Sequence, residues 1–132
     1  MRAAFASLFT LLALLAVAGP AAGAGARPVE ASIAPEATLV DGGAAVLVDV
    51  TVSCAGGSDV LEAFVYVTQD GQQSPFAAIP VRCGGTRTYT VRVPAPSGAT
   101  FHAGTASASG YVLVDKKGTT SSTSPGQTLT IS

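Results

Sequence analysis

Residues 46–57, VLVDVTVSCAGG, carry the clearest secondary-structure pattern in the chain. Valine occupies every second position, and the run leads into Cys54, one of only two cysteines. Because successive side chains of a β-strand point to opposite faces, this alternation predicts a strand with one buried face. The residues expected on that face are Val46, Val48, Val50, Val52 and Cys54.

The same period of two recurs along most of the chain. The further runs are 29–40, broken by Pro35, then 60–69, 76–83, 87–93, 106–115 and 128–131, with turns rich in Gly, Pro and Asp between them. Pro80 favours an edge position for the run 76–83, because proline cannot donate a ladder hydrogen bond. Seven short strands at a spacing of roughly 8 to 12 residues predict an all-β domain. We expect an antiparallel immunoglobulin-like β-sandwich over residues 27–132, with a small Greek-key barrel as the alternative.

The first 26 residues have the three-part pattern of a secretory signal peptide. Arg2 supplies the positive charge, residues 8–18 are an apolar core that we expect to be helical, and Ala24 and Ala26 are candidate cleavage positions. The apolar run is shorter than the roughly 20 residues that a membrane-spanning helix needs. We therefore expect cleavage, secretion to the extracellular medium, and a mature domain that is not bound to the membrane.

The charge balance restricts the partners. Without Arg2 the chain has six basic and eight acidic residues, a net charge of −2. A weakly acidic protein does not attract nucleic acid or an anionic membrane by bulk charge. We expect a monomer whose partner is neither a nucleic acid nor a membrane, but an unknown protein or glycan.

Cys54 and Cys83 each lie at the end of an inward-facing run, and an exported chain meets an oxidising compartment. A disulfide between them is the expected outcome. It would close a loop of about 30 residues and stabilise the fold by roughly 3 to 4 kcal/mol. A metal site is not expected, because the sequence has one imidazole, His102, and no CxxC pair.

The order of several short motifs resembles that of a known group of proteins. These motifs are VDVTVSCAGG (48–57), VTQDG (67–71), VRCGGT (81–86), TVRV (90–93) and FHAGTASAS (101–109). Together with the leader, they resemble small secreted actinobacterial β-sandwich proteins of uncharacterised function, over nearly all of the mature chain. The resemblance implies an immunoglobulin-like fold with a pair of cysteines, and it implies no activity, cofactor or catalytic residue.

The sequence lacks a recognisable catalytic constellation. Asp49 and Glu62 are expected on open outer faces of strands, where nothing shifts a carboxyl pKa toward the range that acid/base catalysis needs. There is no G-x-S-x-G motif around a serine, and His102 is expected to be a surface histidine in a loop or at the start of a strand. We therefore expect neither an enzyme nor a bound cofactor.

Two aromatic residues are the best candidates for a binding surface. Phe64 and Tyr66 are expected on the outer face of the run 60–69, because the better core face is Leu61, Ala63, Val65 and Val67. Arg82 and Arg92, outward on neighbouring runs, complete a possible binding face for an unknown protein or glycan. In the alternative interpretation, the two aromatic residues pack against a connecting loop or the phase of the strand is inverted.

These observations favour a secreted, non-enzymatic binding module. Two alternatives remain at this stage: a small secreted hydrolase inhibitor, and a carrier that holds an apolar small molecule between the sheets.

Overall fold

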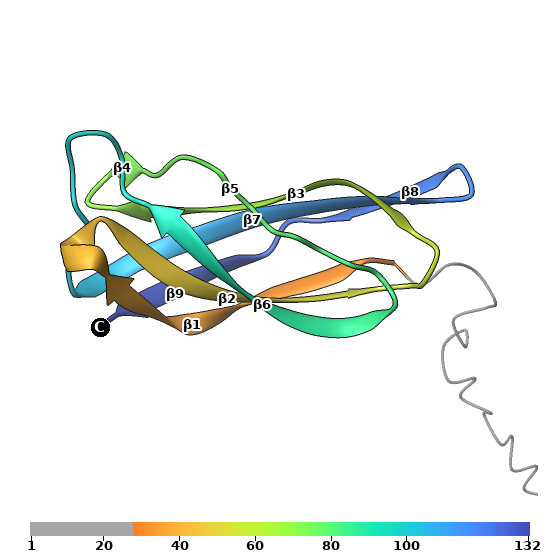
Figure 1. Cartoon of the computed structure of the whole chain (residues 1–132), viewed down its shortest axis with the longest axis horizontal. Helices are drawn as coiled ribbons and strands as arrows, with labels where there is room; N and C mark the ends of the chain where they lie inside the picture. The colour runs from red at the N-terminus through yellow and green to blue at the C-terminus, as the bar shows by residue number, and fades with distance from the viewer. Residues whose placement is uncertain (1–27) are drawn as a thin grey trace, which may run out of the picture.

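The computed structural model describes residues 28–132 as an all-β domain (Figure 1). The predicted signal peptide, 1–26, and its cleavage positions lie outside the described residues. One 3₁₀ turn, η1 (Asp41–Gly43), connects the first two strands. The strands are β1 (Glu30–Val40), β2 (Ala45–Cys54), β3 (Asp59–Gln69), β4 (Gln72–Gln73), β5 (Ala77–Ala78), β6 (Gly85–Pro94), β7 (Gly104–Lys116), β8 (Thr119–Thr123) and β9 (Gly126–Ile131).

All nine strands belong to one curled sheet. Its order is β4-β3-β7-β9-β1-β2-β6, with β5 paired to β3 and β8 paired to β7. Figure 1 shows the curl: β3 and β7 run along one side of the molecule, and β1, β2 and β6 run along the other. The expected all-β class is confirmed, and the sheet provides two facing halves with the core between them.

The expectation of a purely antiparallel sheet is wrong at one pair of strands. β1 and β9 run parallel, with Glu36 opposite Thr130 and Ala37 opposite Ile131. The pairing of β1 with β9 joins the two halves of the curled sheet. At this junction the two neighbouring strands run in the same direction. The break expected at Pro35 is present as a register shift between Ile33 and Ala37, where a proline without an N–H is tolerated.

The core follows the alternation of β2. Its four inward valines and Cys54 are buried, and they belong to one cluster with the inward residues of the other strands. Their burial provides the main driving force of the fold, at about 25 cal/mol per Å² of apolar surface removed from water. The partners from the facing half include Val65, Val67, Val112, Val114 and Leu129.

Two local expectations differ from the structure. Leu61 was expected in the core and is 54% exposed, because a bulge between Val60 and Glu62 shifts the register of β3 against β7. An extra residue in one strand reverses the facing of the side chains before it. The expected strand 76–83 is reduced to β5, and the rest of that segment is an extended connection in which Ile79 is still buried.

Candidate functional site

The outer face of β3 carries the aromatic residues singled out above. Val65 and Val67 are fully buried, so the alternating residues Phe64 and Tyr66 point away from the core and are partly exposed. Across the ladder, Phe64 is opposite Tyr111 of β7, with ring centroids 5.9 Å apart. Three aromatic rings therefore share one outer surface.

Phe76, from the connection between β4 and β5, completes the group. Its ring stacks on Phe64 with a centroid distance of 4.6 Å and an interplanar angle of 13°, and it lies 5.2 Å from the ring of Tyr66. We call Phe64, Tyr66, Phe76 and Tyr111 the aromatic cluster. Phe76 is its outermost member, with 59% of its surface exposed. Phe64 and Tyr66 thus pack against a connecting loop, and the loop itself supplies the exposed ring.

The loop before Phe76 is held by a buried serine. Ser74 is only 3% exposed; its backbone N–H donates to the carbonyl of Val67 at 2.8 Å, and its hydroxyl accepts from the Val67 N–H at 2.9 Å. The same hydroxyl donates to the carbonyl of Pro75 at 2.9 Å. The ring of Pro75 restricts the φ angle of that residue, which lies directly before Phe76. The backbone that presents Phe76 is therefore tied to β3 at Val67, near the end of that strand.

The surface beside the aromatic cluster is rich in hydroxyl groups. Tyr66 is opposite Ser109, Thr68 is opposite Ser107, and Ser107 is in turn opposite Thr128 of β9. We call this the hydroxyl-rich surface; its residues are Thr68, Thr105, Ser107, Ser109, Thr128 and Thr130. The charged residues of β3 and β7 lie at the opposite end of these strands, and they are Asp59, Glu62, Asp115 and Lys116. No residue of the cluster or of the hydroxyl-rich surface is charged. The charged groups that border them are Glu62 beside Phe64, Glu36 opposite Thr130, and the Asp70–His102 pair beyond the end of β3.

The two arginines of the expected binding face lie elsewhere. Arg92 is on β6, in the other half of the sheet, and its Nη2 binds the Oδ2 of Asp41 at 3.0 Å. Arg82 is exposed in the connection before β6, where its backbone N–H donates to the Tyr89 hydroxyl at 2.9 Å. The structure therefore brings Phe64 and Tyr66 together and does not place either arginine beside them.

A polar cluster at the end of β3 was missed in the sequence. The buried side chain of Gln69 donates to the carbonyls of His102 and Thr105 at 2.9 and 3.3 Å, and it accepts from the His102 N–H at 3.0 Å. The His102 ring contacts the carbonyl of Ala103 through Nδ1 at 2.8 Å and the carboxylate of Asp70 through Nε2 at 2.6 Å. Both partners of the ring are acceptors, so only the doubly protonated imidazolium can donate to both. These bonds raise the pKa of His102, with the hydrogen bond to Asp70 the largest cause.

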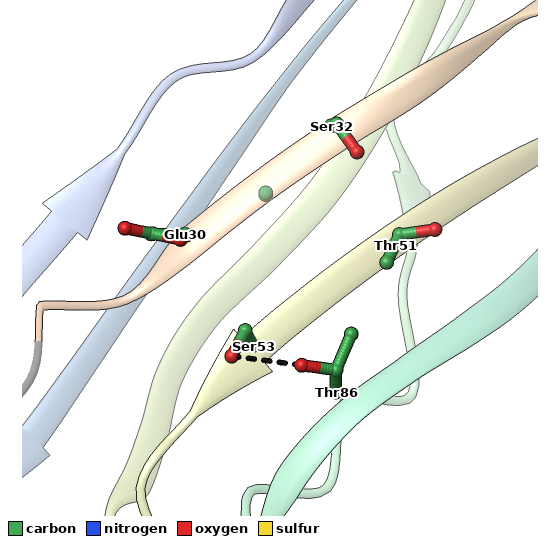
Figure 2. A pocket seen from close by; sticks show the side chains of 6 residues that line it. Glu30, Ser32, Thr51, Ser53 and Thr86 are labelled. Atoms are coloured by element: carbon green, nitrogen blue, oxygen red, sulfur yellow. Dashed lines mark hydrogen bonds between the residues drawn. The ribbon is translucent and has the colours of Figure 1, made fainter.

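A shallow depression of about 250 Å³ lies on the outer face of the other half of the sheet (Figure 2). Its lining residues are Glu30, Ala31, Ser32, Thr51, Ser53 and Thr86. The Thr86 hydroxyl donates to that of Ser53 at 3.1 Å, and the hydroxyls of Thr51 and Thr88 are 2.9 Å apart. Several polar groups here already satisfy one another across neighbouring strands, so the depression offers few free groups to a ligand.

The disulfide between Cys54 and Cys83 is confirmed. It links the end of β2 to the connection before β6, where the Gly84 N–H also donates to the Cys54 carbonyl at 2.9 Å. A disulfide is consistent with an extracellular or otherwise oxidising compartment. Within residues 28–132 there is no helix with the length and apolar character to cross a bilayer, and no group of three or more side chains placed to hold a metal ion.

Comparisons with protein-family models, with curated proteins and with solved structures find no match to this chain.

Proposed function

We propose that this protein is a secreted, non-enzymatic binding module with an immunoglobulin-like sandwich fold, and that the aromatic cluster is its recognition surface. The observation that carries the proposal is the exposure of Phe76 on a hydrogen-bonded loop. Large aromatic side chains contribute much of the binding energy at recognition sites.

Preorganisation supports this assignment. Binding usually costs about 0.5 to 1.5 kcal/mol for each flexible side chain that becomes ordered. Stacking on Phe64 already restricts the Phe76 ring, and the two backbone-linked bonds of Ser74 already restrict its loop. A ligand that covers Phe76 would gain the burial of its ring with little of that cost.

The strand order supports the immunoglobulin-like class. β6, β2 and β1 form one half of the curled sheet, and β9, β7 and β3 form the other, with the core between them. Aligned sheets with inward and outward residues alternating along each strand are typical of that class. The disulfide and the sequence of the leader support secretion.

The two alternatives have less support. A carrier needs an apolar cavity between the halves, whereas the buried valine, leucine and isoleucine side chains of one cluster occupy that space. An inhibitor usually presents a rigid exposed loop to an enzyme; the loop at Phe76 is held by Ser74, but it packs back on β3 through Phe64.

The test compares the wild-type protein with two variants, Phe76→Ala and Leu61→Ala. Leu61 is the matched control because it is a large exposed apolar side chain on the same strand as Phe64, outside the cluster. The immobilised proteins are exposed to the secreted proteins of the host and, separately, to a panel of purified polysaccharides. The proposal expects a ligand that binds wild type and Leu61→Ala equally and binds Phe76→Ala at least about ten times more weakly, a loss of about 1.4 kcal/mol.

Circular dichroism and thermal unfolding check that all three proteins are folded. A ligand that binds Phe76→Ala as tightly as wild type would contradict the aromatic cluster as the recognition surface. An equal loss of binding in Leu61→Ala would mean that binding depends on exposed apolar surface in general and not on the aromatic cluster. This result would contradict the proposal as well.

A further inference from the structure

We infer that the ligand of the aromatic cluster is an uncharged polysaccharide, with sugar rings on the Phe76 side and their hydroxyl groups on the hydroxyl-rich surface. This inference rests on the proposed binding function and adds the chemical class of the ligand. It follows from three features of the same face: the open aromatic ring, the neighbouring hydroxyl groups, and the lack of an unpaired cationic side chain beside them.

The first feature is the open ring. Phe64 covers one face of Phe76 at a centroid distance of 4.6 Å, so the exposed surface of Phe76 lies on its other face and its edge. The face of an aromatic ring is electron-rich, and the C–H groups on one side of a pyranose are weakly positive and apolar. A sugar ring that stacks on Phe76 therefore gains both apolar burial and electrostatic attraction.

The second feature is the arrangement of hydroxyl groups beside the rings. Ser109 lies across from Tyr66, and the pair Thr68 and Ser107 follows along the same two strands. Serine and threonine hydroxyls can each donate one hydrogen bond and accept two. A sugar hydroxyl has the same capacity, so a chain that extends from Phe76 along β3 and β7 meets groups able to pair with it in either direction.

The third feature is the absence of an unpaired cationic side chain beside these residues. The charged groups that border this face are the carboxylates of Glu62 and Glu36 and the paired side chains of Asp70 and His102. Lys116 lies at the far end of β7, and β9 has no charged residue. An acidic glycan or a nucleic acid would leave its anionic groups without a cationic partner. Protein interfaces are enriched in arginine as well as in aromatic residues, and both candidate arginines lie away from the cluster. A neutral glycan leaves no such group unpaired.

The test measures migration in native gels that contain soluble xylan, galactomannan, β-1,3-glucan or starch, with heparin and polygalacturonate as charged counterparts. Cellulose and chitin are tested by co-sedimentation. The proteins are wild type, Phe76→Ala, Phe76→Tyr, the double variant Thr68→Val with Ser107→Ala, and the control Leu61→Ala. Calorimetry at 50 and 500 mM NaCl follows for any ligand that retards wild type.

We expect one or more neutral polysaccharides to bind wild type and Leu61→Ala equally, and to bind Phe76→Ala at least about tenfold more weakly. Phe76→Tyr should retain binding because it keeps the ring, and the double variant should weaken it about fivefold because two hydrogen bonds are lost. The affinity should not change with salt, since no ion pair forms.

Two outcomes would overturn this inference while leaving the proposed function intact: Phe76-dependent binding of a secreted protein with no polysaccharide bound, and Phe76-dependent binding that is confined to heparin or polygalacturonate. Binding of a neutral polysaccharide that is equal in wild type and Phe76→Ala would refute the aromatic cluster as its site. The absence of any Phe76-dependent ligand, protein or polysaccharide, would refute both proposals.

Discussion

Replacing Cys54 and Cys83 together by alanine should lower the free energy of unfolding by about 3.6 kcal/mol. The two cysteines are 29 residues apart, and closing a loop of that length removes about 12 cal/mol/K of entropy from the unfolded chain in the chain-entropy model. Small domains have total stabilities of about 5 to 15 kcal/mol, so the variant should lose a quarter or more of the stability. With a slope near 1.5 kcal/mol per molar urea, the midpoint should fall by about 2 M.

The assay is urea unfolding of three samples: oxidised wild type, reduced wild type, and the double alanine variant. Reduced wild type is the matched control, because it keeps the buried Cys54 side chain and loses only the covalent bond. We expect both altered samples to be destabilised by similar amounts, with a small additional packing loss in the alanine variant. A loss below about 1 kcal/mol in reduced wild type would refute the argument, since the loop entropy would then be absent from the unfolded state.

Three further predictions follow from local contacts. Gly43→Ala should destabilise the fold by about 2 kcal/mol or more in the same urea assay, because φ is +94° and a Cβ would lie only 2.4 Å from the carbonyl oxygen of Phe101; a loss below about 0.5 kcal/mol would contradict the contact. The pKa of His102 is raised above 6.5, so its bond to Asp70 stabilises the fold fully below pH 6.5, and this contribution disappears as the pH rises through the raised pKa. The difference in melting temperature between wild type and His102→Gln should therefore shrink as the pH rises above 6.5, and a difference that grows over that range would contradict a raised pKa. Leu61→Ala should change the stability by less than about 0.5 kcal/mol because this residue is exposed at the bulge, whereas a core position would cost 2 to 5 kcal/mol.

The parts of the fold that depend on local alternation could be predicted from the sequence. The alternating valines of β2 indicate which face of the strand is buried, and Cys54 lies on the same face. Cys54 forms its disulfide with Cys83 there. The outward position of Phe64 and Tyr66 follows from the same rule, because Val65 and Val67 compete successfully for the core.

The parts of the fold that depend on a partner strand could not be predicted from the sequence. The bulge that exposes Leu61 exists because β3 shifts register against β7, and nothing in the run 60–69 marks the position. The parallel pairing of β1 and β9 joins strands from the two ends of the domain, and periodicity within either strand is the same for parallel and antiparallel neighbours.

The candidate site shows the same division. Phe76 was included in an expected strand, and its stacking on Phe64 depends on how the connection after β4 folds back. A usable signal was present in Ser74-Pro75, a pair that favours a turn and interrupts a strand. The contact of His102 with Asp70 joins two loops far apart in the chain, so only the tertiary structure reveals it.

The position of β9 has a consequence for how the chain folds. It lies between β7 and β1 in the sheet, yet it follows both of them in the sequence, so the two halves of the sheet cannot be joined until residues 126–131 have been synthesised. Such long-range pairing is slow compared with the formation of hairpins. Until then, the edges of β1 and β7 that β9 will cover are unpaired, and unpaired edges readily recruit strands from other chains. The interval before β9 pairs is therefore the stage at which this protein is most exposed to aggregation.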